Sequence, residues 1–536
     1  MSSRKKGSKA RRPAATLHPT FLDLFCGCGG FSLGLMRAGF RCMGALDSDR
    51  TAVETYQKNL IDFRHPHLLP AECVMQADLR TMSPESLAER IGATSVDVVV
   101  GGPPCQGFSS ARKVDGANHG SRLKHDPRRH LFEDFLRFVE FFRPRVFVME
   151  NVMGMRSAAG GEYFTAVQRV ARKIGADGSG PRYRVHSQVE DARLLGVPQK
   201  RRRQLIVGVR MDAPCYLLPE VPPAPSATPN LPLGKAIGDL PPLSSASGSP
   251  SRAYDLPRRR RHLKKHGLAA ESFLEEVLEV GLAAELTSHV ARRQSERDLR
   301  DFARLREGES SATAARDRGV EFEFPYSRES FPDRYTRQSR SGPCSTIVAH
   351  LAKDGLMFIH PTQNRTLTPR EAARIQTFPD WFSLPSGMGA AFRLIGNAVP
   401  PLVAEAVGLH IRRFLQLPVR SKTSSSFPSS SPASLALTAS LSPSHLRTLS
   451  KAELLSMWRM TLDTFTYLHP ENARDLGDAV EGMGERDRIA ALSSGLSGDC
   501  HARSGWPTEL AALAREVIRR ESKGALLSSE LHLLHP

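Results

Sequence analysis

The chain has 536 residues, enough for two or three domains. It carries 74 Lys and Arg against 56 Asp and Glu, a formal net charge of +18. So large an excess of one sign favours a polyanionic partner, and nucleic acid is the usual one.

The ends and the cysteines narrow the class of protein further. The basic N-terminus has no apolar signal core, and no run of ~20 apolar residues follows, so we expect a soluble cytoplasmic protein without membrane contact. Its eight cysteines show no C-x-x-C pairs. We therefore expect neither a disulfide framework nor a zinc site, and no metal.

Residues 1–16 form a basic arm, interpreted as disordered and either simply solvated or a non-specific DNA tether. Between residues 20 and 210 apolar runs alternate with helical patterns. This alternation predicts an α/β fold with a mostly parallel, Rossmann-like sheet. The expected strands are 20–25, 41–47, 74–77, 96–100, 146–150 and 205–209, and the expected helices are 31–38, 50–59, 84–91, 131–142 and 161–174.

The alternation of expected strands and helices ends after residue 210. Residues 211 to about 340 are rich in Pro, Ser and Arg, and 268–286 has the pattern of an amphipathic helix. Helical order returns over 365–416, where Thr368 is a candidate helix cap and Pro369 the first helical residue. A Ser/Pro-rich linker over 418–445 precedes a helical segment, 446–536, that carries no interpretable motif.

The first strand runs into Phe-Cys-Gly-Cys-Gly-Gly at residues 25–30 and then into a helix. Glycines at such a turn let backbone N–H groups approach a ligand, and Asp47, which ends the next strand, has the spacing of a ribose-binding acid. The pattern indicates a nucleoside-bearing cofactor but is not G-x-G-x-x-G, which argues against a dinucleotide. A structural tight turn is the alternative.

Cys105 follows the strand at 96–100 and the sequence Gly-Gly-Pro-Pro. Ligands of parallel sheets bind at the carboxyl ends of strands, so this cysteine is placed to present a thiolate rather than to fill a core. Glu150 ends another buried strand, where an acidic side chain either forms a structural ion pair or has a functional role. The run Gln199-Lys-Arg-Arg-Arg203 is either a solvated face or a cluster of functional arginines.

Six segments together resemble the S-adenosylmethionine-dependent, bacterial-type cytosine-C5 DNA methyltransferase family, in that family's order. They are residues 21–35, 97–110, 146–152, 196–208, 365–380 and 395–401. The resemblance implies a class I methyltransferase fold, with a catalytic domain at 17–210, a smaller target-recognition region at 211–364, and helices at 365–417 that complete the catalytic domain.

The resemblance assigns roles residue by residue. Cys105 would attack C6 of cytosine, Glu150 would bind N3 and the amino group and supply a proton, and Arg201 and Arg203 would serve the catalytic centre, with Arg203 at O2. The cofactor site would comprise Phe25, Gly27, Cys28, Gly30, Asp47, Asp78, Leu79, Pro104, Leu131 and Asn397. The expected DNA contacts are Gln106, Ser109, Arg258, Arg259, Arg260 and Arg261.

The target base must leave the duplex to reach such a site, and residues 109–122 have the composition of a mobile lid or an ordinary surface loop. The substrate would be double-stranded DNA, and the enzyme a monomer that serves a restriction–modification system or acts as an orphan methylase. The sequence leaves open whether a cognate endonuclease is a partner and whether the protein associates with the nucleoid. The alternatives are the same chemistry on RNA, disfavoured by the Gly-Phe-Ser sequence after Gln106, and a catalytically dead DNA-binding protein.

Overall fold

The computed structural model of the chain describes residues 18–61, 69–104, 130–157, 162–212, 221–325 and 333–415. They lie within one compact unit of residues 1–213 and 220–418. The basic arm, Cys105, the expected lid and everything after residue 415 lie outside the described residues.

A seven-stranded sheet forms the centre, in the order β3-β2-β1-β4-β5-β7-β6. Its strands are β1 (Thr20–Leu24), β2 (Arg41–Asp47), β3 (Val74–Gln76), β4 (Val98–Gly101), β5 (Val146–Val152), β6 (Tyr183–Asp191) and β7 (Arg202–Arg210). The first five are parallel, and β7 pairs antiparallel with both β5 and β6. The expectation of a mostly parallel α/β sheet is confirmed.

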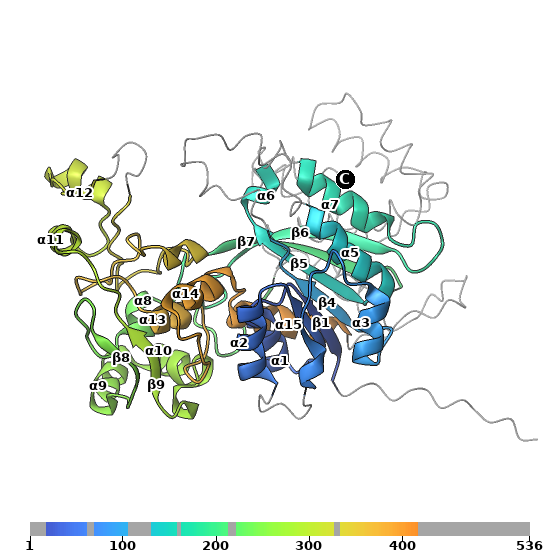
Figure 1. The fold of residues 1–536 in the computed structure, drawn as a ribbon, viewed down its shortest axis with the longest axis horizontal. Coiled ribbons are helices and arrows are strands. Elements are labelled where there is room, and N and C mark those ends of the chain that lie inside the picture. The colour runs from blue at the N-terminus through green and yellow to red at the C-terminus, as the bar shows by residue number, and fades with distance from the viewer. Residues whose placement is uncertain are drawn as a thin grey trace, which may run out of the picture. The chain divides into compact units, whose positions relative to one another are not determined.

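Helices cover both faces of this sheet. They are α1 (Gly30–Arg37), α2 (Arg50–Leu60), α3 (Pro84–Ile91), α5 (Leu131–Phe142), α6 (Gly154–Ser157), α7 (Glu162–Lys173) and α15 (Pro401–Leu415). Figure 1 shows α3, α5 and α7 on one face and α1, α2 and α15 on the other. The parallel strands read as apolar runs because they are buried on both sides, and every residue of β4 is buried.

Chain order along the sheet reverses between β1 and β4. At such a switch point the loops after two neighbouring strands diverge to opposite faces and leave a crevice at the carboxyl ends. The glycine turn after β1 and the Gly-Pro-Pro turn after β4 both start there. The topology therefore places these two motifs side by side.

Further elements lie among the described residues between 221 and 364, within the segment expected to recognise the target, and this part of the chain is called the recognition region below. They are α8 (Leu233–Ile237), β8 (Gly248–Arg252), α9 (Leu256–His266), α10 (Leu268–Ser272), β9 (Leu286–Val290), α11 (Glu296–Arg304) and α12 (Ser311–Arg318). Strands β8 and β9 pair antiparallel, and a second apolar cluster around Phe302 and Tyr335 supports α11 and α12. Helices α13 (Pro369–Ile375) and α14 (Met388–Asn397) follow.

Two sequence predictions differ from the structure. The amphipathic helix expected at 268–286 is wrong, because Glu279 adopts a left-handed conformation with φ 49° and Leu286 begins β9. Only short helical pieces remain, α10, a π turn at Phe273–Val277 and a 3-10 turn at Val280–Leu282. Strand β6 was not predicted, since most of its residues are only half-buried and its sequence is polar.

One stretch, Met388–Leu415, is long and apolar enough by composition to cross a membrane. It consists of α14 and α15, separated by residues 398–400, and 67% of its most apolar window is buried inside the protein. Helix α15 packs along α1, so the apolar residues of this stretch belong to the core.

Candidate active site

The turn after β1 is held in a conformation that needs glycine. Phe25, Gly27 and Gly29 have φ values of 64°, 55° and 92°. The carboxylate of Asp47 at the end of β2 accepts from the N–H of Gly27 at 2.9 Å and of Asp49 at 2.8 Å. Burial raises the pKa of Asp47. The acid expected to bind a ribose therefore also fixes the glycine turn.

Asp78 lies beyond the neighbouring strand β3, where the N–H of Ala77 donates to the Asp47 carbonyl at 2.9 Å. Its carboxylate pairs with Arg80 at 2.5 Å, and the hydrogen bonds from this side chain lower the pKa of Asp78. Leu79 and Leu131 are both buried. The structure thus brings two expected cofactor-site acids, Asp47 and Asp78, to adjacent strand ends, with Asp78 paired to its near neighbour Arg80.

The segment expected to close the cofactor site lies against the glycine turn. A Cβ on Gly30 would stand 2.2 Å from the carbonyl oxygen of Val399, so only glycine fits. The buried Cys28 thiol approaches the Leu394 carbonyl at 3.9 Å, and burial raises its pKa to about 12. Asn397 is exposed at the end of α14. Residues 395–401 and 25–30, far apart in sequence, therefore form one wall.

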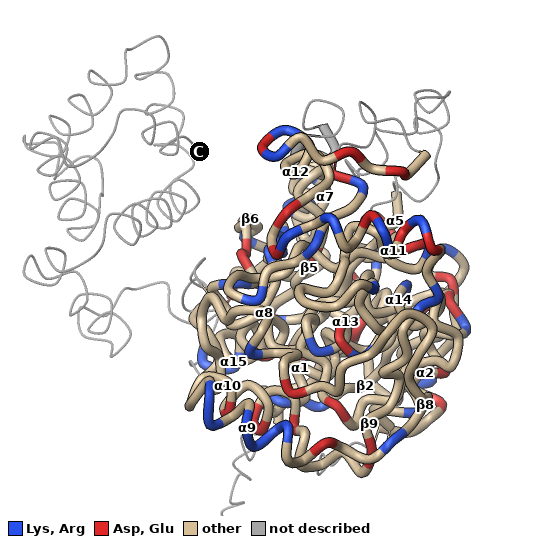
Figure 2. Tube along the Cα trace, turned by 90° about the vertical axis from the view of Figure 1, so that its left-hand side faces the viewer, with Lys and Arg blue, Asp and Glu red and all other residues tan. Residues whose placement is uncertain are grey.

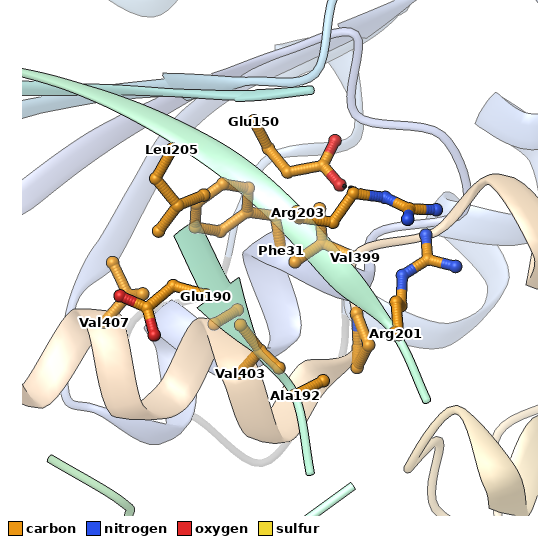
Figure 3. A pocket seen from close by; sticks show the side chains of 12 residues that line it. Phe31, Glu150, Glu190, Ala192, Arg201, Arg203, Leu205, Val399, Val403 and Val407 are labelled. Atoms are coloured by element: carbon orange, nitrogen blue, oxygen red, sulfur yellow. Dashed lines mark ion pairs between the residues drawn. The ribbon is translucent and has the colours of Figure 1, made fainter. Parts of the chain in front are cut away.

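Glu150 and Arg203 form an ion pair of 2.9 Å between their side chains, which are only 13% and 17% exposed (Figure 3). They lie on the antiparallel neighbours β5 and β7, where Glu150 pairs with Leu205 and Val152 with Arg203. A carboxylate and a guanidinium that both keep some exposure can each turn toward a ligand.

The turn that leads to Cys105 lies beside this pair. A Cβ on Gly102 would come within 3.3 Å of a carboxylate oxygen of Glu150, and the Asn151 amide donates to the Pro103 carbonyl at 3.4 Å. Pro104 is half-buried at the end of the described segment. Cys105, Gln106 and Ser109 lie outside the described residues.

Arg201 is 2% exposed and donates to the carbonyl oxygens of Ile347 and Ala398, each at 2.9 Å. The buried Gln199 bonds Gln376 at 2.7 Å and accepts from the N–H of Ile347 at 3.0 Å. Together they tie the start of β7 to the end of the recognition region and to the closing segment. Arg203 rather than Arg201 faces Glu150 (Figure 3).

Sequence reasoning missed a buried charge network around α13, although it found the helix cap. Arg365, Arg370 and Arg374 are fully buried. Glu371 accepts from the two terminal guanidinium nitrogens of Arg365, at 2.8 and 2.7 Å, and completes a capping box with Thr368. Burial opposes the ionisation of Glu371, but the charge of Arg365 outweighs it and holds its pKa well below the usual range. The Thr-x-x-Glu spacing was the available signal.

The expected DNA-contact arginines are on α9, which begins at the cap Asp255. This basic cluster is therefore helical rather than a loop, and its contact with DNA stays a prediction. Arg258 donates to the Gly238 carbonyl, and Arg259 stacks 4.3 Å over the ring of Tyr254. Arg260 and Arg261 are exposed. The structure separates the four residues into an inner and an outer pair.

The sheet order and the site at its carboxyl edge define a methyltransferase of the class I fold. The model of the family described as C-5 cytosine-specific DNA methylase matches residues 19–413. The chain belongs to this family and is a DNA (cytosine-5-)-methyltransferase, a class that uses S-adenosylmethionine and acts on DNA.

Relatives and a solved structure agree with this assignment. The chain is 33% identical over 409 residues to the type II methyltransferase M.DdeI of Desulfomicrobium norvegicum, with 74% of this chain and 89% of the relative covered. It is 31% identical over 450 residues to M.AgeI of Thalassovita gelatinovora, covering 73% and 98%. A prophage-encoded DNA modification methyltransferase from E. coli superposes with a TM-score of 0.55 at 26% identity, covering 74% and 99%.

Proposed function

We propose that this enzyme transfers the methyl group of S-adenosylmethionine to C5 of a cytosine within one specific double-stranded DNA sequence. The proposal rests on one observation, the Glu150–Arg203 ion pair. This pair is partly exposed at the carboxyl edge of the sheet and lies beside the turn that leads to Cys105. Acid, cation and nucleophile would then surround one flipped-out base.

In the proposed reaction the Cys105 thiolate attacks C6 and forms a carbon–sulfur bond, and the C5=C6 electron pair moves into the ring toward N3 and O2. Glu150 protonates or hydrogen-bonds N3, while Arg203 stabilises negative charge at O2. C5 would then take the methyl group as the carbon–sulfur bond of the donor sulfonium breaks and S-adenosylhomocysteine leaves. Loss of the C5 proton to solvent would supply the electron pair of the new C5=C6 bond, the C6–sulfur pair would leave with Cys105 as a thiolate, and any proton on N3 would return to Glu150.

The residues around the glycine turn fit the methyl donor. Asp47 presents a carboxylate at the ribose position, beside a glycine turn that lets a ligand approach the backbone closely. S-adenosylmethionine supplies an electrophilic methyl group when it is bound. The wall formed by residues 25–30 and 395–401 would exclude water from the transfer.

Methyl transfer to unmethylated genomic DNA, followed by base-resolution sequencing for 5-methylcytosine, tests the proposal. The wild type is expected to methylate one short motif. Cys105→Ser should lose transfer by a factor of at least ~10³ while binding the cofactor normally, because the alcohol is a far weaker nucleophile. Retained turnover in this variant would refute the covalent mechanism. Transfer to tRNA but not DNA would refute the DNA substrate.

The relatives named as type II methyltransferases support a role in restriction–modification, with an orphan methylase as the second candidate. In that role the protein acts in the cytoplasm as a monomer on the nucleoid, and a cognate endonuclease would cut the same motif. Digestion of unmethylated DNA by lysate of the source cell tests this role, since cleavage at the methylated motif requires the endonuclease.

A further inference from the structure

Helix α9 carries its cations on two different faces. At 100° per residue, Arg260, Arg261, Lys264 and Lys265 fall within one 140° sector, which we call the outer basic face. All four are exposed. The opposite sector holds Arg259, which pairs with Asp239, and the buried His262, which bonds the Lys235 carbonyl at 3.1 Å. The inner face anchors the helix and leaves the outer one to solvent.

Within the described residues, no acidic side chain forms an ion pair with the outer basic face. Its residues repeat as like charges at i and i+4, a spacing that destabilises a helix. The helix dipole favours Lys264 and Lys265 in the last turn, but it does not account for Arg260 and Arg261 in the middle. A bound polyanion would compensate the repulsion.

The outer basic face is remote from the carboxyl edge of the sheet. Helix α1 starts at that edge and runs back, so its last residue, Arg37, lies at the opposite edge. Arg37 donates to the Val277 carbonyl at 3.0 Å and pairs with Glu279, just after α9 and α10 in the chain. Figures 1 and 2, turned about the vertical axis, both draw α9 at the lower end, well below β5, the strand that carries Glu150.

We propose that the outer basic face is a second DNA-binding surface, which holds the phosphate backbone of a duplex segment other than the one at the active site. The inference rests on the proposed function, because the polyanion that this enzyme meets is DNA. Flexible cations with no base-reading partner bind any sequence. The surface would therefore add affinity on long DNA without altering the choice of target.

The test replaces all four residues of the outer basic face by glutamine in the full-length chain. One fluorescent duplex without the target motif is titrated onto enzyme saturated with a short target duplex and S-adenosylhomocysteine. We expect the Kd of the second duplex to rise at least tenfold in the variant. The slope of log K against log salt should fall by about 3 to 4, since each phosphate contact contributes ~0.9.

The matched control removes four positive charges from exposed residues on separate elements. These are Arg41, Lys58, Lys173 and Lys353, each replaced by glutamine. Its Kd for the second duplex should stay within about twofold of wild type. Equal losses in both variants would overturn the proposal, because net charge rather than one face would then be responsible.

Methylation assays separate this inference from the proposed function. On a short target duplex the double variant Lys264→Gln/Lys265→Gln, which spares the expected DNA contacts Arg260 and Arg261, should keep wild-type kcat and KM within about twofold, whereas its KM on kilobase DNA should rise. A wild type that binds no second duplex, or a variant with unchanged KM on long DNA, would overturn the second surface. A wild type that methylates no DNA would instead overturn the proposed function.

Discussion

Asp47 combines two tasks in one side chain. Its carboxylate holds the Gly27 and Asp49 amides, and it stands where the methyl donor's ribose is proposed to bind. Charge-assisted hydrogen bonds contribute about 1.5–3 kcal/mol each. The affinity for the cofactor should therefore depend on the charge of this residue as well as on its shape.

Asp47→Asn should weaken the binding of S-adenosylhomocysteine by ~10- to 100-fold in titration calorimetry, because the neutral amide makes weaker bonds to a ribose. Asp97 provides a matched control, since it also accepts backbone and side-chain bonds from Thr20, at 2.8 and 2.9 Å, but at the amino end of the sheet. Asp97→Asn should leave the affinity within about twofold. Equal weakening in both would contradict the role of Asp47.

Asp23 is a buried acid in the middle of β1 that the mechanism does not use. Its side chain accepts from the Ser32 hydroxyl at 2.6 Å, and burial raises its pKa to about 7. Between the ordinary carboxyl value of 3.8 and about 7 the folded state binds more protons than the unfolded state. The stabilising contribution of Asp23 to the free energy of unfolding is therefore fully present below pH 4 and is lost as the pH rises through 7.

Asp23→Asn should remove that pH dependence. The amide keeps an acceptor for Ser32 and bears no charge to desolvate, so the variant should be more stable than wild type at pH 8, by up to about 4 kcal/mol. Urea unfolding at pH 5 and pH 8 measures the difference. A variant that is less stable than wild type at pH 8 would disprove the buried-charge argument.

At the scale of elements, α1 and α15 pack against each other at close range. A Cβ on Gly34 would stand 2.3 Å from the Pro401 carbonyl oxygen and 2.4 Å from the Ala404 Cβ. Helices that approach this closely exclude any side chain between them. The two helices carry the glycine turn and the closing segment, so their spacing also sets the wall of the cofactor site.

Gly34→Ala should destabilise the protein by about 1–3 kcal/mol, because the extra methyl group forces the helices apart. Gly389→Ala in α14 is the matched control, since nothing lies within 4 Å of its added Cβ. There the gain in helix propensity should stabilise by about 0.5–1 kcal/mol. Thermal unfolding of both variants measures these changes. An unchanged Tm in the Gly34→Ala variant would show that α15 moves away from α1 at little energetic cost.

At the scale of the whole molecule, the family model ends at residue 413, and residues 446–536 stay without an assigned role. The elements that the structure describes, including those of the site, lie before residue 416. A chain truncated after Pro418 should therefore methylate the same motif at a rate within about threefold of wild type. Sequencing of DNA methylated by both chains checks this prediction, and a changed motif would give the tail a role in recognition.

The domain boundaries of the sequence analysis stay predictions, although the contacts bear on them. Helix α15 packs on α1 in the catalytic domain, whereas α13 packs against α8 and β9 of the recognition region. The helices expected at 365–417 thus serve both parts. Arg374, for instance, joins Asp239 to Asp380 inside this junction.

By itself the sequence determined the alternation of strands and helices and the family, because period-2 and period-3.6 patterns and glycine turns act locally. Helices 84–91 and 131–142 have the bounds that were predicted. Only the tertiary structure decided which arginine meets Glu150, that Arg259 turns inward, and that Glu279 ends a helix. These depend on strand register and on contacts between residues far apart in the chain, where one residue of shift reverses the face a side chain occupies.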